Sequence, residues 1–455
     1  MENHKDKLFV GGDISGIQNF IYNITSCKAA ASLKGRSKWL TNYMKQVYDS
    51  VLAIPAIQSS SLTEPIYCGG GKFFLVVPNT DEVKAALEGL RRKEETELWE
   101  KHYGQLAFNL AVVQYQAEFS KNFDSASEKF AKQKNRKFET LLHDRYEQFF
   151  DVQKVGGTPK VCEITGIEGE TVKLAKGEDI DVLPSVREQV ELGRKIRKEY
   201  HDLSDADTFE NYAKDSYLGV LRMDVDNLGA AFRSCKTKED YSIFSKQLTD
   251  FFEKRLDQIW REMYHDKTDI IYAGGDDLFV VGKWNVIVDF AERIHDEFIR
   301  AFPNHTLSGG MAIVKGKFPI AKAAELAGEA EKLSKHFNTN QKNAFTLLGV
   351  TVSWQNDFDY VKRQKCQFVN LCKRDNMPRA ILHKLMTLDV IRQRGELQYM
   401  WNMVYFLKRF AEGKTDNVKA FCNQLKKELL DSRKFELVAL AARWAELELR
   451  ENNNN

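Results

Sequence analysis

An internal repeat constrains the fold of this chain more than any other feature of its sequence. Residues 8–13 read as a short strand followed by a helical segment, and residues 217–224 open a second stretch with the same pattern. In each stretch two apolar runs then flank a glycine turn, in residues 66–77 and again in residues 269–281. Two apolar runs joined by a short glycine turn are typical of a β-hairpin. The chain therefore contains the same hairpin-centred unit twice.

A charged helical segment and a returning strand complete each stretch. These segments are 81–103 and 106–115 in the first repeat (residues 8–115), and 284–302 and 307–314 in the second repeat (residues 217–314). Both repeats thus have the order β-α-β-β-α-β, which is that of a ferredoxin-like domain. We predict an α+β chain with two such domains, a connector and a C-terminal α-helical domain.

Composition shifts set the predicted boundaries between these domains. The connector is charged and helix-prone with a small β-like island at 161–174, and the sequence becomes purely helical after about residue 352. The predicted domains are 1–117 (first ferredoxin-like domain), 118–216 (connector), 217–352 (second ferredoxin-like domain), 353–450 (helical domain) and 451–455 (disordered tail).

Charge and cysteine usage narrow the cellular context. The formal net charge of the 455 residues is +2, so the chain as a whole is not a polyanion binder. Residues 361–450 nevertheless hold 19 Lys and Arg against 10 Asp and Glu, an excess that either steers nucleic acid or coats solvated helices. Seven scattered cysteines without a close pair predict reduced thiols. Because no apolar run reaches 18 residues, we expect a cytoplasmic protein without a membrane partner.

Three carboxylates of the second repeat are the strongest candidates for chemistry. Asp224 ends its first strand, and Asp276 and Asp277 follow Gly274 and Gly275 at its hairpin turn. In a β-α-β-β-α-β domain the end of the first strand lies beside that turn. Hard carboxylate oxygens are the ligands that Mg²⁺ prefers, and phosphoryl transfer requires divalent metal. The sequence predicts a Mg²⁺ or Mn²⁺ site formed by the three acids.

Several other residues keep two interpretations. A Gly-Gly-Asp-Asp turn on its own can be a polar hairpin, and the pairing with Asp224 is what favours a site. Asp226 and Asn227 either cap the following helix or contribute ligands. Residues 308–310 either line a nucleotide pocket or relieve packing. The lysines that either reach a triphosphate or are solvated are Lys315, Lys332 and Lys335. Four His-Asp dipeptides, beginning at His143, His201, His265 and His295, are predicted to be surface pairs.

Five motifs together resemble one known family. Residues 12–22, 33–37, 69–71, 221–229 and 274–277 are similar to the large polymerase-cyclase subunit, or cyclic oligoadenylate synthase, of type III CRISPR effector complexes, in particular type III-A. The resemblance covers nearly the whole chain. It implies two palm domains, the second of which condenses ATP into cyclic oligoadenylates with 3′-5′ linkages once the complex binds target RNA. It also implies CRISPR RNA, backbone subunits and small helical subunits as partners.

The resemblance assigns roles residue by residue. Asp224, Asp276 and Asp277 match the metal-holding acids, and the acid-free turn of the first palm matches the pocket of the acceptor ATP. Ser308 and Gly309 match the strand that lines the adenine pocket. Together with the interpretation of the residues themselves, this gives the predicted nucleotide-binding residues Ser15, Gly16, Gly69, Gly70, Gly71, Asn227, Gly274, Gly275, Ser308, Gly309 and Lys332.

The sequence departs from the family pattern in two places, and each departure leads to an expectation. The first palm begins near Leu8, which leaves no room for the family's N-terminal His-Asp nuclease domain, so no DNase activity is expected. Cys162 stands alone where the connector's zinc site would have a cysteine pair, so no zinc is expected.

Two competing functions remain open beside the enzyme. One is a non-catalytic, RNA-binding scaffold subunit of the same complex. The other is a stand-alone cyclase that resembles the GGDEF family, whose glycine turn normally continues Glu-Phe, whereas this turn continues Asp-Leu-Phe.

Overall fold

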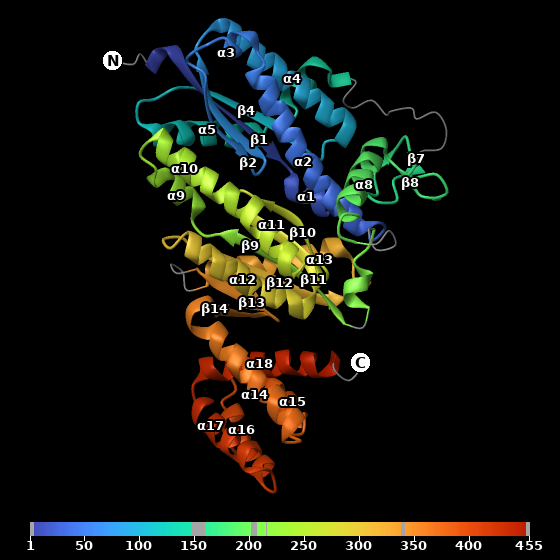
Figure 1. Cartoon of the computed structure of the whole chain (residues 1–455), viewed down its shortest axis with the longest axis vertical. Helices are drawn as coiled ribbons and strands as arrows, with labels where there is room; N and C mark the ends of the chain where they lie inside the picture. Colours follow the sequence, from blue (N-terminus) through green and yellow to red (C-terminus); the bar gives the residue numbers. More distant parts are fainter. Residues whose placement is uncertain (1–3, 148–159, 202–206, 215, 338–341, 452–455) are drawn as a thin grey trace. The chain divides into compact units, whose positions relative to one another are not determined.

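The computed structural model (Figure 1) describes residues 4–147, 160–201, 207–214, 216–337 and 342–451. The chain divides into two compact units. The first unit comprises Met1–Asn211, Asn227–Val281 and Lys317–Lys322, and the second comprises Tyr212–Asp226, Gly282–Gly316 and Ala323–Asn455. None of the helices in these described ranges is long and apolar enough to cross a membrane. Of the predicted tail at 451–455, Glu451 is the last residue of the final helix and not part of a tail, and residues 452–455 lie outside the described residues.

A four-stranded antiparallel sheet organises the first unit. Its strands are β1 (Lys7–Ser15), β2 (Glu64–Gly69), β3 (Lys72–Pro78) and β4 (Ala107–Gln114), in the order β2-β3-β1-β4. Helices α1 (Ile17–Tyr22), α2 (Ala29–Leu52) and α3 (Pro55–Gln58) connect β1 to β2, and α4 (Asp81–His102) connects β3 to β4. The β-α-β-β-α-β order predicted for the first repeat is confirmed.

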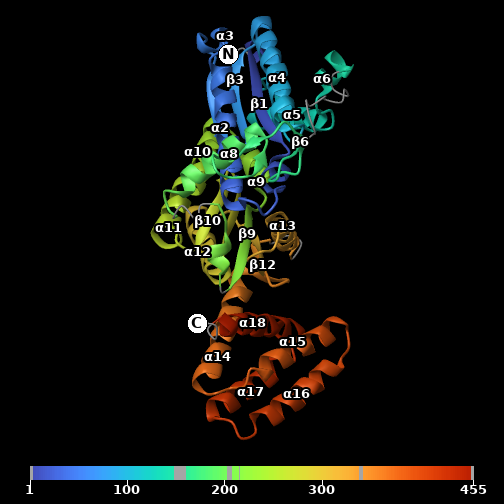
Figure 2. The ribbon, with the colours of Figure 1, turned by 90° about the vertical axis from the view of Figure 1, so that its right-hand side faces the viewer.

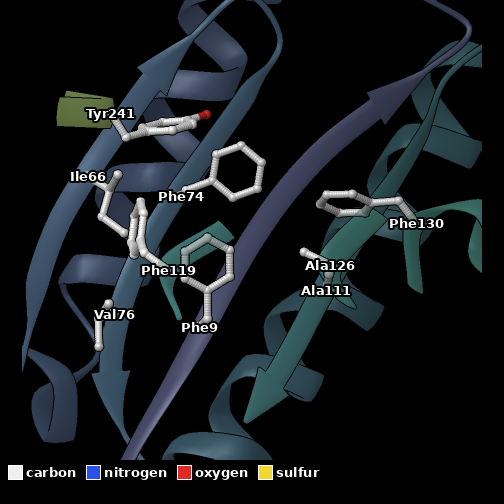
Figure 3. Close-up of a cluster of buried hydrophobic side chains, with 9 residues drawn as sticks. All are labelled: Phe9, Ile66, Phe74, Val76, Ala111, Phe119, Ala126, Phe130 and Tyr241. Carbon is white, nitrogen blue, oxygen red and sulfur yellow. The ribbon is translucent and has the colours of Figure 1, made fainter. Parts of the chain in front are cut away.

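Aromatic side chains fill the core on one face of this sheet. Figure 3 shows Phe9 of β1 beside Phe74 of β3, with their ring centroids 5.5 Å apart, and Phe119 and Tyr241 close to them. Phe119 begins α5 (Phe119–Lys134), and Tyr241 lies in α10 (Lys238–Thr249). Burying each such ring stabilises the fold by about 2–3 kcal/mol. The core therefore holds α5 and α10 against the sheet.

The connector is anchored by a glycine contact between two helices. Helix α8 (Pro184–Arg197) crosses α2 so closely that a Cβ atom on Gly35 would lie 1.7 Å from the carbonyl oxygen of Gln189. A Cβ atom on Gly193 would lie 1.8 Å from the carbonyl oxygen of Ala31. The neighbouring guanidinium of Arg36 is buried and donates to Gln189 Oε1 at 3.1 Å. The motif at 33–37 therefore docks the connector onto α2.

Apart from α5 and α8, the described part of the connector consists mainly of short elements. They are α6 (Glu139–Asp144), β5 (Lys160–Val161), β6 (Glu168–Gly169), β7 (Val172–Lys173) and β8 (Asp181–Val182). The pairs β5-β6 and β7-β8 form two small sheets where the sequence predicted a β-like island.

The first unit also contains the helices and hairpin from the middle of the second repeat. These are α9 (Leu228–Ser234), α10, a π-helical turn (Asp250–Arg255), α11 (Leu256–Met263), β10 (Thr268–Gly274) and β11 (Asp277–Lys283). Strands β10 and β11 are neighbours, as expected for the hairpin around the Gly-Gly-Asp-Asp turn.

The second unit contains the first and the last strand of the second repeat. Strand β9 (Tyr217–Val225) pairs antiparallel with β12 (Leu307–Lys315), and α12 (Trp284–Ala301) precedes β12. Along the chain the second repeat thus runs β9, α9 to α11, β10, β11, α12, β12, the predicted order. Helix α13 (Ile320–His336) follows.

Two short strands after α13 escaped the sequence prediction. Strand β13 (Ala344–Leu347) pairs parallel with β12, and β14 (Val350–Ser353) pairs antiparallel with β13. Their turn places Leu348 and Gly349 at φ 52° and 82°. The β-branched run around a glycine was the available signal for this hairpin.

The chain after β14 is helical, as predicted. A π-helical turn (Trp354–Phe358) leads into α14 (Asp359–Arg374), α15 (Ala380–Gln393), α16 (Gln398–Ala411), α17 (Asp416–Glu428) and α18 (Ser432–Glu451). Figure 2 shows these helices, in orange and red, packed as a bundle.

Candidate nucleotide and metal site

The glycine turns of the two hairpins touch in the first unit. A Cβ atom on Gly70 would lie 3.2 Å from the Cα atom of Gly275, and one on Gly275 would lie 3.4 Å from the Cα atom of Gly70. Their φ angles are 55° and 68°, a region that glycine adopts without steric cost. The structure therefore brings the predicted turns at 69–71 and 274–275 into backbone contact.

Both turns are built around a tyrosine two residues before the first glycine. A Cβ atom on Gly69 would lie 2.9 Å from the hydroxyl oxygen of Tyr67, and one on Gly274 would lie 3.1 Å from that of Tyr272. The Tyr272 hydroxyl donates to the carbonyl of Gly274 at 3.2 Å. The Tyr-x-Gly spacing recurs in both repeats, and it was the sequence signal for these tyrosines.

A cavity of about 330 Å³ lies on one side of the paired turns. Its walls come from α1 and α2, the two hairpins and the acidic side chain of Glu253. Burial raises the pKa of the Glu253 carboxyl. Among the lining residues are Ile17, Leu40, Met44, Tyr48, Tyr272 and the glycines Gly69, Gly70, Gly71 and Gly274. A mainly apolar pocket with a few polar groups suits a flat ring system such as a nucleobase.

A second cavity, of about 250 Å³, shares Gly69 and Gly70 and adds Gly275. It is lined by the cations Lys72 and Arg233, by aromatic rings that include Tyr67 and Phe123, and by the carboxylate of Asp276. Two cations beside bare glycine backbone suit a phosphate group. The sequence analysis assigned neither cation a role: Lys72 directly follows the Gly-Gly-Gly turn, whereas Arg233 stands in no motif.

Burial and neighbouring charges shift the pKa values of side chains at the Gly-Gly-Asp-Asp turn. Burial raises the pKa of the Asp276 carboxyl, and the positive charge of Lys72 opposes that rise. Burial also raises the pKa of Tyr272 well above its usual value, with further contributions from the negative charges of Asp277 and Asp276. The two acids and the buried tyrosine therefore form one electrostatic group at the turn.

Asp224 lies in the second unit and is held by a lysine. The ammonium of Lys335, on α13, donates to Asp224 Oδ2 and also lies 3.5 Å from Glu331 Oε1. Burial lowers the pKa of Lys335 to about 8. Lys315 and Lys332, the other two candidate lysines, are exposed. The convergence of Asp224 with Asp276 and Asp277 stays a prediction, as does a contact of Lys332 with phosphate.

Asp226 does not cap the following helix, and its role as a ligand stays a prediction. The N-cap of α9 is Asn227, at φ 55°, whereas the Asp226 carboxylate is 3% exposed and points into the protein. Its Oδ2 atom accepts from the hydroxyls of Thr306 and Ser308, each at 2.8 Å, and from the amide of Asn343 at 3.1 Å. Asp226 thus ties the end of β9 to β12 and to the start of β13.

The hydrogen bonds to Asp226 also involve Ser308, which with Gly309 was predicted to line the adenine pocket. Ser308 is fully buried, and its hydroxyl is donated to Asp226. A Cβ atom on Gly309 would lie 2.8 Å from Met223, so this glycine relieves packing between β9 and β12. A nucleotide contact for Ser308 and Gly309 stays a prediction.

Ser15 and Gly16 lie at the corresponding turn of the first repeat. The Ser15 hydroxyl accepts from Asn109 Nδ2 at 2.7 Å, and Gly16 is the N-cap of α1 with φ 94°. A Cβ atom on Gly16 would lie 2.2 Å from the carbonyl oxygen of Gln105. Backbone geometry alone therefore requires glycine at this position.

Two of the four predicted surface His-Asp pairs are wrong. His201 is 8% exposed at its side chain and contacts Asp269, in β10, at 3.3 Å. His295 hydrogen-bonds to Asn343 at 2.9 Å and stacks on Trp354. His295 lies in α12, where residues adjacent in sequence point in different directions, and His201 follows the end of α8; both turn inward to distant partners. The pairs at His143 and His265 are at the surface as predicted.

The donor chemistry fits a hard divalent cation. Asp276 and Asp277 present carboxylates at a glycine turn, and Asp224 already holds a cationic group, the ammonium of Lys335. Among the described residues, no cluster of three or more His, Cys, Asp or Glu side chains is assembled that could hold a metal ion. A metal site formed by Asp224, Asp276 and Asp277 therefore stays a prediction.

Two known protein families match parts of this chain. Residues 217–346 match the family described as "Cas10/Cmr2, second palm domain", and residues 7–154 match "Csm1 subunit domain B". The chain is a Cas10/Csm1 homologue of subtype III-A. The two matched regions contain the Gly-Gly-Asp-Asp turn and the Gly-Gly-Gly turn, respectively.

Three relatives bear the name "CRISPR system single-strand-specific deoxyribonuclease Cas10/Csm1 (subtype III-A)". The homologue is 23% identical to the one from Mycobacterium tuberculosis, with 93% of this chain and 64% of that protein covered. It is 27% identical to that of Enterococcus italicus (73% and 53%) and 23% identical to that of Streptococcus thermophilus (89% and 62%). The chain thus spans 53–64% of the length of these relatives.

Solved structures share the fold over nearly all of this homologue. A Csm1–Csm4 cassette in complex with pppApApA superposes with a TM-score of 0.72 at 18% identity, covering 97% of this chain and 69% of that chain. The same cassette with cA4 gives 0.71 at 18% identity (97% and 70%), and with AMPPNP 0.69 at 17% identity (97% and 70%).

Proposed function

We propose that this Cas10/Csm1 homologue is a nucleotidyltransferase that condenses ATP into cyclic oligoadenylates through 3′-5′ linkages. The observation that carries the proposal is the backbone contact between Gly70 and Gly275, with a cavity on each side of it. Two pockets that share one glycine wall suit two nucleotides that must react with each other. The complexes of solved Csm1–Csm4 structures with ATP, pppApA and cyclic oligoadenylates agree with this substrate class.

The chain's own residues divide the work of binding. The glycine backbone of both turns lets phosphate oxygens approach closely, since no side chain stands in the way. Lys72 and Arg233 offset triphosphate charge in the smaller cavity, and the apolar walls of the larger one exclude water from a base. Holding two substrates in a fixed orientation removes much of the entropic barrier to their reaction.

Mg²⁺ or Mn²⁺ would be held by Asp224, Asp276 and Asp277. When bound, such a cation supplies compensation for the charge that accumulates on phosphate oxygens. Without a bound cation, the ammonium of Lys335 neutralises the Asp224 carboxylate. This partly buried ion pair also keeps the carboxylate in place.

The proposed setting is a type III effector complex in the cytoplasm. Solved relatives are assembled with Csm4 in the type III-A Csm complex, and we extend to this homologue a backbone subunit of that kind, small helical subunits, CRISPR RNA and target RNA. Target RNA would then be the signal that starts synthesis.

A product assay tests the proposal against both alternatives. The purified chain, alone and assembled with its partner subunits and matched RNA, is incubated with ATP and Mg²⁺ or Mn²⁺, and products are identified by chromatography and mass spectrometry. We expect 3′-5′ cyclic oligoadenylates. RNA-dependent assembly without any such product would establish the scaffold function instead. Preferential conversion of GTP would establish the GGDEF-like cyclase.

A further inference from the structure

The first repeat contains a counterpart of the Asp224–Lys335 ion pair. Asp13 in β1 and Asp224 in β9 each stand three residues before a helix N-cap in the left-handed region, Gly16 at φ 94° and Asn227 at φ 55°. In the sheet registers, Asp13 faces Asn109 of β4 and Asp224 faces Ser308 of β12. The two aspartates therefore occupy the same place in the two repeats.

A side-chain bond supports this alignment independently. Asn109, opposite Asp13, donates to Ser15, which is two residues after Asp13, at 2.7 Å. Ser308, opposite Asp224, donates to Asp226, two residues after Asp224, at 2.8 Å. The same cross-strand bond thus recurs with different side chains.

The lysines of the two pairs are equivalent as well. Helix α5 follows β4, and α13 follows β12 in the same way. Lys134 and Lys335 are each the sixteenth residue of their helix. The ammonium of Lys134 forms an ion pair with Asp13 Oδ2 at 2.7 Å, as that of Lys335 does with Asp224 Oδ2.

The hairpin turns are where the two repeats differ. Alignment of the glycine turns places Lys72 where the second repeat has Asp277. Lys72 faces Asp13 in the β1–β3 register, and its ammonium lies 3.9 Å from Asp13 Oδ1. Where the second repeat has the carboxylate of Asp277, the first repeat therefore has the ammonium of Lys72.

We propose that Asp13 is the remnant of a cation site that the chain now fills with its own ammonium groups, those of Lys134 and Lys72. The Asp13 side chain is 3% exposed, and a buried carboxylate requires a positive partner. Each of its oxygens has one, so a divalent ion would meet two like charges. The first palm therefore holds its nucleotide without a metal of its own, and the two palms cannot exchange roles.

This inference rests on the proposed function for the metal site of the second palm, yet it can be tested without catalysis. Binding of Mn²⁺ to the full-length chain is measured by calorimetry and electron paramagnetic resonance in a D276A/D277A background, which removes the second-palm acids. We expect no tight Mn²⁺ site in that background. Adding K72D and K134M is expected to create about one Mn²⁺ site per chain, and adding D13N to these is expected to remove it.

Each outcome decides the inference. Suppose that the D276A/D277A chain with K72D and K134M added has the circular dichroism of the wild type. If it then binds no more Mn²⁺ than D276A/D277A itself, the inference is wrong. A site in the D276A/D277A background that D13N removes while both lysines are native would also overturn the inference. Should K72D/K134M fail to fold, the reverse substitution D277K in the native chain is decisive. We expect D277K to abolish the second-palm Mn²⁺ site and D277N only to weaken it, and equal binding by the two would sink the inference. Lack of cyclase activity alone would reject only the proposed function.

Discussion

Gly70 and Gly275 pack so closely that a Cβ atom on Gly70 would lie 3.2 Å from the Cα atom of Gly275. The wall between the two cavities is therefore a single layer of backbone at this point. Both residues have φ values that L side chains rarely adopt, at 55° and 68°. The site consequently depends on the absence of side chains as much as on the presence of acids.

Replacing Gly70 with alanine tests this dependence. We expect G70A to cost about 1–2 kcal/mol of backbone strain and to lower oligoadenylate synthesis about tenfold or more, because the turns must separate. The measurements are urea unfolding and product yield. Gly89, in α4, is the control, since a Cβ atom there meets nothing within 4 Å. G89A is expected to be neutral or slightly stabilising. Full synthesis by G70A would show that the glycine contact does not matter.

Removing both acids of the turn tests the assignment of the metal-holding residues. We expect D276A/D277A to abolish synthesis while RNA binding and assembly stay intact, because Asp276 lies in the hairpin turn, Asp277 begins β11, and both residues remain partly exposed. Product analysis and native gel shifts measure the two properties. Asp266, an exposed residue of the loop before β10, is the control, and D266A should behave as wild type. Failure of the double variant to assemble would argue for a structural role.

Asp226 offers a stability prediction. Its buried carboxylate accepts three hydrogen bonds through one oxygen. We expect D226A to destabilise the chain by about 2–4 kcal/mol, because three buried donors would lose their common acceptor, whereas D226N should cost less, since its amide oxygen can take the place of Oδ2. Single removals of a donor, T306V or S308A, should cost about 1–2 kcal/mol each. Unfolding by urea measures all of these variants, and a D226A chain as stable as wild type would refute the described network.

The pH dependence of synthesis follows from the turn's electrostatics. Burial raises the pKa of Asp276, so this carboxyl takes up a proton at a higher pH than an ordinary aspartate, and synthesis should fall there as the pH drops. Lys72 lowers that pKa, so K72M should move the acid limb to higher pH. A pH–rate profile of both proteins measures the shift, with K84M in α4 as the control. An acid limb that stays in place or moves to lower pH in K72M would contradict the described coupling.

The repeat made the architecture predictable from sequence. Strand, glycine turn and strand recur with local spacing, so the hairpins at 66–77 and 269–281 and the terminal helices could be placed without long-range information. The partners of Asp226 and the ion pair between Asp13 and Lys134 could not, because they join segments far apart in the chain. The inward turn of His201 and His295 was missed for the same reason.

The glycine crossing of α2 and α8 has a mechanical consequence. With backbone against backbone at Gly35 and Gly193, the two helices cannot slide past each other or rotate without a clash. Lys34, next to that crossing, donates to the carbonyl of Ile270 in β10, the strand that ends at the Gly-Gly-Asp-Asp turn. A movement of α8 would therefore be transmitted through α2 to the hairpin that carries the Gly-Gly-Asp-Asp turn.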